Sequence, residues 1–301
     1  MSLNFGDVIT RAGQITWKNK SLWGAAFVMA FAIYLFFPLM FVPMFMIMFE
    51  NNPNRWFDSP LPWVLMGVGF FVTMFLSFGL TPLVRAALTV GALKADRGAE
   101  KVSFHEIFSD GRAFYLRLLG LMLLYFVASM LVITVFFGIQ VLGTVLTMGL
   151  ATICMTPLMV LMYPLMFAAV AWMELAESAI VADGLGVLDA CRRAWDLLRA
   201  NKMNIFVIAL IVYVGIGTLS SLFIFLLMLP MFFAPVLFMD GGEISNGLLW
   251  GAGIWAALFI LVMSIVQGIG MVFMKTTWLL AYLRMRPTPS EETVVVVESN
   301  G

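Results

Sequence analysis

The 301 residues are 62% hydrophobic and only 11% charged, and the 17 basic and 17 acidic side chains cancel to a formal net charge of zero. Soluble domains contain about 45–50% apolar and about 25% charged residues, so this composition excludes an ordinary soluble fold, which could not cover its surface with polar groups. The chain is therefore expected to lie in a membrane.

Long apolar gaps between the charged residues predict membrane-crossing helices. One crossing takes about 20 apolar residues in a helix. Four gaps hold one crossing each, and the gap at 118–173 holds two, with a break marked by Gly138, Gly143 and Gly149. We therefore predict an all-α, polytopic membrane protein with six transmembrane helices in residues 1–286. The predicted spans are about 21–49, 61–84, 114–137, 150–173, 204–239 and 248–274.

Two other interpretations of these apolar runs are disfavoured. A membrane barrel alternates apolar and polar residues along each strand, whereas these runs are apolar on every face. The first run begins near residue 21, exceeds the usual apolar core of a signal peptide and lacks a clear small-residue cleavage site. We expect this run to be retained as a span.

The basic residues lie almost entirely on one side of the predicted membrane. The loops at 50–60, 138–149 and 240–247 share one side, and of the 17 basic residues only Arg55 lies there. Basic residues are retained on the cytoplasmic side, which predicts a multi-pass bacterial inner-membrane protein with both termini in the cytoplasm. The acidic segment 287–301 is expected to be a disordered cytoplasmic tail.

A short charged motif occurs twice, each time before an odd-numbered span. The segments "DVITRAGQITWKNK" (7–20) and "DACRRAWDLLRANK" (189–202) both begin with Asp, continue with Arg-Ala and end with Asn-Lys. In each, apolar residues at helical spacing share one face, as in a helix that lies along a membrane surface. These apolar residues are Phe5, Val8, Ile9, Ala12 and Ile15 in the first copy, and Val187, Leu188, Cys191, Ala194, Trp195 and Leu198 in the second.

A weaker copy, with Phe104, Ile107 and Phe108 on its apolar face, precedes the third span. We call the three amphipathic segments, at about 3–19, 102–112 and 186–201, the elbows. The pattern predicts three units, each an elbow helix followed by a two-span hairpin, and all inserted the same way round.

The basic residues of the elbows are candidate contacts for anionic lipid head groups, since each such charge near the surface contributes about 1 kcal/mol. An alternative is that they only set the topology. Asp7 and Arg11, and likewise Asp189 and Arg193, are spaced as ion pairs on one helical face. The candidate lipid contacts are Lys18, Lys20, Arg192, Arg193, Arg199 and Lys202.

The segment "AIVADGLGVLDACRRAWDLLRANKMNIF" (179–206) resembles the membrane domain that is fused to some bacterial glycerophosphodiester phosphodiesterases. It also resembles related stand-alone six-span proteins of unknown function. Those chains carry a similar segment after the fourth span, and residues 98–108 match their segment before the third. The resemblance implies a six-span membrane domain and supplies no catalytic residues. The resemblance does not imply hydrolase activity. The catalytic domain of those phosphodiesterases is a separate soluble barrel that needs two histidines, whereas this chain has only His105.

The sequence predicts no catalytic, metal-binding or cofactor-binding residues. His105 has no second histidine or nearby cysteine to complete a site, and Cys154 and Cys191 lack the spacing of a metal site. Arg85, Glu174 and Lys275 lie at the cytoplasmic ends of even-numbered spans. Although ionisable residues in spans often mark ion pathways, we expect these three to extend to the membrane interface.

The leading expectation is a non-enzymatic protein with an accessory or scaffold role in bacterial membrane or envelope lipid homeostasis. The alternative is a transporter for a lipid-like or small apolar substrate, favoured by proline pairs that break or kink helices and can free backbone groups to line a cavity. A subunit of a larger membrane complex is a third option. The expected partners are membrane lipids, with anionic lipids as candidates, and no nucleic acid; homo-oligomers stay open. The proline pairs are Pro38/Pro43, Pro157/Pro164 and Pro230/Pro235.

Overall fold

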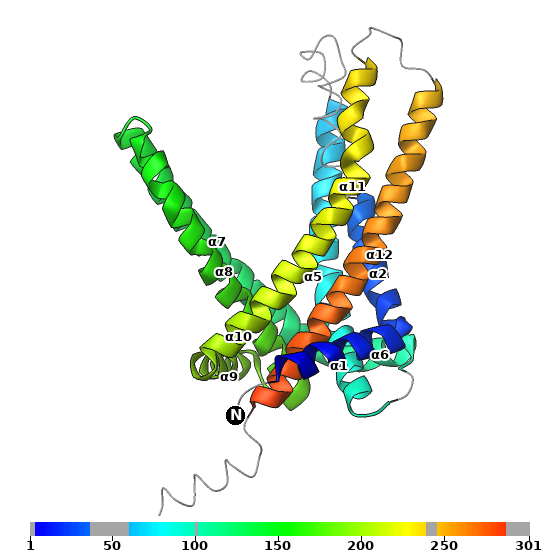
Figure 1. Ribbon diagram of the computed structural model, residues 1–301, viewed down its shortest axis with the longest axis vertical. Helices are drawn as coiled ribbons and strands as arrows, with labels where there is room; N and C mark the ends of the chain where they lie inside the picture. The colour runs from blue at the N-terminus through cyan, green and yellow to red at the C-terminus, as the bar shows by residue number, and fades with distance from the viewer. Residues whose placement is uncertain (1–3, 37–59, 100–101, 239–245, 287–301) are drawn as a thin grey trace, which may run out of the picture.

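The computed structural model describes residues 4–36, 60–99, 102–238 and 246–286, and every regular element in these ranges is a helix (Figure 1). Five helical stretches are long and apolar enough to cross a membrane. A sixth crossing is reached if α1 (Phe5–Lys18) and α2 (Lys20–Phe36), which meet at 82°, count together as one span. The all-α membrane fold is confirmed.

The other helices follow in the predicted order. The long ones are α5 (Pro60–Asp96), α7 (Tyr115–Leu146), α8 (Leu150–Asp183), α11 (Gly215–Phe238) and α12 (Asn246–Met285). The short ones are α6 (Phe104–Gly111), α9 (Val187–Ala200) and α10 (Lys202–Ala209), with a 3-10 turn η2 (Arg112–Phe114) and a π-helical turn η3 (Leu210–Val214). The tail 287–301, Arg55 and most of the loops 50–60 and 240–247 lie outside the described residues.

The predicted loop at 138–149 is wrong in its length. Helix α7 continues through Gly138 and Gly143, and only residues 147–149 separate it from α8. Glycine is common in membrane helices. A break in the helix would leave backbone N–H and C=O groups without hydrogen-bond partners in lipid, so the helix continues through these glycines. The break at Gly149 is confirmed, with a left-handed φ of 95°.

Two of the proline pairs lie inside continuous helices and do not break them. Helix α8 spans Pro157 and Pro164, and helix α11 spans Pro230 and Pro235. The pair at 38 and 43 lies outside the described residues. A break at the two described pairs is therefore excluded, and a kink at either pair stays a prediction.

The three elbow helices α1, α6 and α9 lie together at one end of the molecule, which we call the elbow end (Figure 1). Each precedes a pair of long helices, as the repeated motif predicts. Asn4 caps α1 by accepting a hydrogen bond from the backbone N–H of Asp7 at 3.3 Å. The apolar face of α1, formed by Val8, Ala12 and Ile15, is buried against α2, α5 and α12. Neighbouring helices therefore cover the apolar face of α1.

The hydrophobic core lies near the elbow end, and the helices diverge from it in two arms (Figure 1). The hairpin of α7 and α8 forms the two-helix arm, and α2, α5, α11 and α12 form the four-helix arm. The buried residues of α7 are Leu118 and Leu121, and from Leu123 onward many of its large apolar side chains are exposed. Exposed apolar surface on this scale is expected to face lipid.

Candidate functional site

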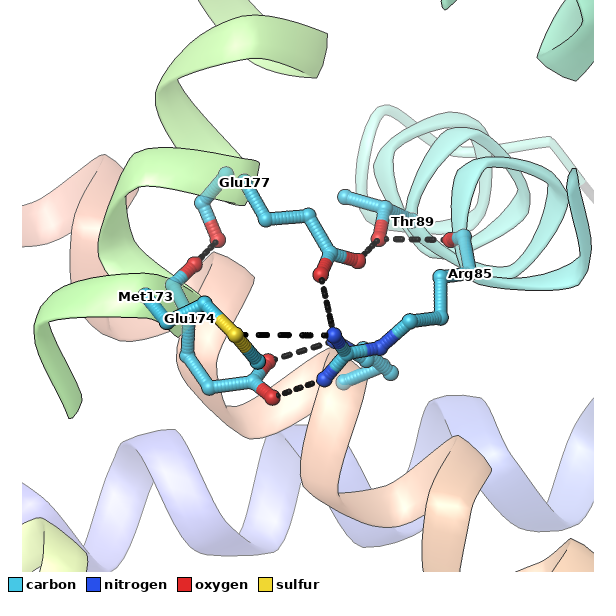
Figure 2. Close-up of polar contacts among 7 residues, drawn as sticks. Arg85, Thr89, Met173, Glu174 and Glu177 are labelled. Atoms are coloured by element: carbon cyan, nitrogen blue, oxygen red, sulfur yellow. Dashed lines mark hydrogen bonds and ion pairs between the residues drawn. The ribbon is translucent and has the colours of Figure 1, made fainter. Parts of the chain in front are cut away.

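Four charged side chains meet inside the protein where α5, α8 and α12 pack together. Figure 2 shows Arg85 between Glu174 and Glu177. Arg85 comes from α5, Glu174 and Glu177 from α8, and Lys275 from α12. The exposed fraction is 2% for both glutamates and for the lysine, and 8% for the arginine. We call these four residues, together with Thr89, the charge cluster.

Both cations of the charge cluster bridge both carboxylates. Arg85 Nη2 lies 2.5 Å from Glu174 Oε1, and its Nη1 lies 3.5 Å from Glu177 Oε2. Lys275 Nζ donates to Glu174 Oε2 at 2.6 Å and to Glu177 Oε2 at 2.7 Å. The Thr89 hydroxyl lies 3.1 Å from Glu177 Oε1, so all four carboxylate oxygens have a partner.

Helical spacing and charge balance explain why this cluster can be buried. Glu174 and Glu177 are three residues apart and therefore share one face of α8, as Arg85 and Thr89, four residues apart, share one face of α5. Two neighbouring carboxylates would repel each other, and an unpaired buried charge is strongly destabilising. Two cations between them bring the net charge of the cluster to zero.

The expectation that Arg85, Glu174 and Lys275 extend to the interface is wrong. Their side chains turn inward because partners of opposite charge are available there, which removes the need for water. Glu177 was missed altogether. One feature of the sequence could have indicated the cluster: acidic and basic residues occur at a similar depth in three even-numbered spans, so they can pair.

The charge cluster is better suited to holding α5, α8 and α12 together than to catalysing a reaction. Each acid and base of the cluster is already paired, so a proton could exchange there only after an ion pair separates. Within the described ranges, no group of three or more His, Cys, Asp and Glu side chains could hold a metal ion. The charge cluster is therefore an electrostatic joint between the two-helix arm and the four-helix arm.

The candidate lipid contacts all lie at the elbow end, on α1, α2, α9 and α10. Five of them are exposed, and Arg193 is half-buried. Arg199 stacks over the ring of Trp195, with the guanidinium carbon 4.7 Å from the ring centroid. The five exposed residues are Lys18, Lys20, Arg192, Arg199 and Lys202.

The apolar face predicted for the third elbow is only partly correct. Ala194 is buried, Cys191 and Leu198 are half-buried, and the face against α8 is completed by Ala190 and Leu197. Leu188 and Trp195 are instead 67% and 46% exposed. The predicted stripe is wider than the surface that the protein covers, which leaves these two apolar side chains free to contact lipid.

The first predicted elbow pair is replaced by pairs with neighbouring helices. Asp7 pairs with Arg284 of α12 at 2.6 Å, and Arg11 Nε donates to Asp96 of α5 at 3.3 Å. Helix α1 lies across the ends of α12 and α5, so their terminal charges are within reach. The Asp189–Arg193 pair stays a prediction.

The remaining candidates for chemistry are consistent with structural roles. His105 is exposed on α6. Cys191 packs against the core, its backbone oxygen accepts a hydrogen bond from Trp172 Nε1 at 3.1 Å, and burial raises the pKa of its thiol above the ordinary value.

Comparison with known proteins identifies a family without a described function. No curated protein and no solved structure matches the chain. A family model matches residues 21–285, from the start of α2 to the end of α12. The chain therefore belongs to the family described as Domain of unknown function (DUF7847).

Proposed function

We propose that the protein is a non-enzymatic membrane protein with an accessory or scaffold role in lipid homeostasis of the bacterial cytoplasmic membrane, with both termini cytoplasmic. The observation that supports this most is the gathering of three elbow helices with exposed basic residues at one end of the molecule. Such a surface suits anionic head groups, while exposed Leu188 and Trp195 beside it suit the apolar layer below them.

The lipid contact can be tested by melting the reconstituted protein in liposomes with and without anionic phospholipid. The wild type should be more stable in anionic liposomes. A variant with Arg192, Arg199 and Lys202 changed to Gln should lose most of this difference, about 1 kcal/mol per charge before salt screening. Arg193 is left unchanged because it is half-buried.

Trp195→Ala is the matched control on the same helix. It removes an exposed apolar side chain and should lower stability by similar amounts in neutral and anionic liposomes. If the Gln variant gains as much from anionic lipid as the wild type does, the basic residues only set the topology.

A transporter of lipid-like molecules is a second candidate function, favoured by the two diverging arms and the charge cluster that joins them. Ion pairs between separate helices can exchange partners when the helices move, which permits an alternative arrangement of the arms. In proteoliposomes carrying a fluorescent phospholipid, transport between leaflets should let dithionite bleach the inner leaflet as well. Bleaching limited to the outer leaflet, as in empty liposomes, would remove this candidate.

A further inference from the structure

A cavity of about 260 Å³ lies at the elbow end, between α1 and the end of α5. Ile15, Asn19 and Ala95 are buried and form its floor, whereas the residues at its rim are exposed or half-buried. A ligand can therefore enter this cavity from the surface. The complete lining is Arg11, Gln14, Ile15, Lys18 and Asn19 on one side, and Ala95, Gly98 and Ala99 on the other.

The wall from α5 is shaped by the way this helix ends. Gly98 has a left-handed φ of 99°, which turns the chain back at the end of the helix. The backbone N–H groups of Gly98 and Ala99 then donate to the carbonyl oxygens of Ala95 and Lys94, at 3.3 and 3.1 Å. These last carbonyl oxygens of α5 are therefore already paired within the protein.

The wall from α1 consists of hydrogen-bond donors on one helical face. Arg11, Gln14 and Lys18 are three and four residues apart, so their side chains are neighbours. Asp96 orients Arg11: Nε donates to its carboxylate at 3.3 Å and Nη2 to its backbone oxygen at 3.4 Å. Among the described residues, Arg11 Nη1 and the polar groups of Gln14 and Lys18 have no hydrogen-bond partner. Three sets of donors thus face the cavity without an acceptor.

The charges around the cavity favour an anion with a single negative charge. Arg11 and Asp96 form an ion pair that is neutral as a whole, and Lys18 adds one positive charge to the lining. A cation would be repelled by the two basic side chains, whereas a singly charged anion balances the lysine.

The end of α1 beside the cavity has a feature typical of the membrane–water interface. Trp17, next to Lys18, is 68% exposed, and its ring meets that of Trp23 edge-on with the centroids 5.1 Å apart. Tryptophan is enriched at the level of the lipid head groups. The anionic group that a membrane offers at this level is the phosphate of a phospholipid.

We propose that this cavity binds the phosphodiester group of a phospholipid with a net negative charge. Arg11 Nη1 and Lys18 Nζ donate to the phosphate oxygens, in charge-assisted hydrogen bonds, and the Gln14 amide donates to a further oxygen of the head group. This inference rests on the proposed contact with anionic lipid. It adds a defined site for one lipid on the first elbow, apart from the basic surface of the third.

The test counts the phospholipids bound to the full-length protein in an uncharged detergent, by native mass spectrometry during a titration with dioleoylphosphatidylglycerol. Dioleoylphosphatidylcholine is the control lipid, because it has the same chains and a phosphodiester but also a choline cation. One molecule of phosphatidylglycerol should bind more tightly than phosphatidylcholine does. Lys18→Gln should weaken this first binding step about tenfold, because it removes one charge-assisted hydrogen bond.

Lys20→Gln is the matched control variant. Lys20 is also exposed at the elbow end, two residues further along the chain, but it does not line the cavity. The variant loses the same charge and should weaken the first binding step less than about twofold. The variant with Arg192, Arg199 and Lys202 changed to Gln should keep this first step, because those residues lie on α9 and α10.

Dimethyl phosphate, a phosphodiester without chains, distinguishes a membrane lipid from a soluble ligand. If it displaces the first phosphatidylglycerol only in large excess, the site takes a lipid. If it does so at concentrations similar to that of the lipid, the site recognises a phosphodiester from any source. Either result supports recognition of the phosphodiester in this cavity.

Two results would overturn the proposal. Equal weakening by Lys18→Gln and Lys20→Gln would show that only the overall charge of the elbow end matters. Equal binding of the two lipids would exclude selection of a head group with net negative charge. If either result is found while anionic liposomes still stabilise the wild type, this cavity fails as a site and the proposed lipid contact of the elbows stands.

Discussion

Lys275 shows how a single residue can decide whether several others are tolerated in the interior. Its ammonium group reaches Glu174 and Glu177 at 2.6 and 2.7 Å, and all three side chains are 2% exposed. Water cannot replace a lost partner at this depth. Lys275 therefore stabilises the protein mainly because, without it, two buried carboxylates would share a single cation, which raises the free energy of the folded state.

Lys275→Met should destabilise the protein by about 3–5 kcal/mol, because it leaves the cluster with one uncompensated negative charge. Unfolding in detergent, followed by circular dichroism during a denaturant titration, measures the loss. Adding Glu177→Gln to Lys275→Met returns the net charge to zero and should recover much of the stability. Arg85 would then still face Glu174 at 2.5 Å.

Lys94→Met is the surface control for this prediction. Lys94 bridges Glu106 and Asp110 of α6 with 31% of its side chain exposed, so its loss should cost less than about 1 kcal/mol. Equal losses for the two lysine variants would mean that the charge cluster is no more important than a surface ion pair.

Close contact between helices depends on residues without side chains. At Gly111, where α6 ends beside α5, an added Cβ would lie 2.9 Å from the backbone nitrogen of Ala87. At Gly91 an added Cβ would lie 2.5 Å from the flexible end of Leu22, which can move. At the α5–α6 contact backbone therefore meets backbone, as it also does where an added Cβ on Gly268 of α12 would lie 3.2 Å from the backbone nitrogen of Phe27 on α2; small residues permit such packing of membrane helices.

Gly111→Ala should destabilise the protein by about 1–3 kcal/mol, because the added methyl group meets a backbone that cannot move away locally. Its φ of −61° is helical, so the effect is steric. Gly138→Ala on α7 is the control: nothing lies within 4 Å of the added Cβ, so stability should be unchanged or rise by up to about 1 kcal/mol. If both variants melt at the same temperature, α5 and α6 are not in this close contact.

At the scale of the whole molecule, the sequence predicted what depends on local periodicity. Apolar runs identified the long helices, and the motif around Asp7 and Asp189 identified the elbows, since both signals repeat within a few turns. The charge cluster could not be predicted in this way, because Glu174 is 89 residues from Arg85 and 101 from Lys275. The expectation that each charged side chain extends to the membrane interface considered every helix by itself in lipid. It left out charged partners on neighbouring helices.

The π-helical turn at Tyr213 could not be predicted from sequence patterns either. A π-turn has no sequence signature comparable with apolar periodicity, and the 62% hydrophobic composition hides which aromatic rings meet. The family match from residue 21 to 285 covers the long helices without identifying a site.

The charge cluster also sets a condition on biosynthesis, because its members enter the membrane at different times. Arg85 arrives with α5 and the two glutamates with α8, whereas Lys275 lies near the end of the described chain, on α12. Until α12 is inserted, the nascent protein contains two carboxyl groups and one cation at the joint between its arms. Before α12 is inserted, the cluster thus has one acidic group without a basic partner, and Lys275 on α12 completes the neutralisation of the joint between the arms.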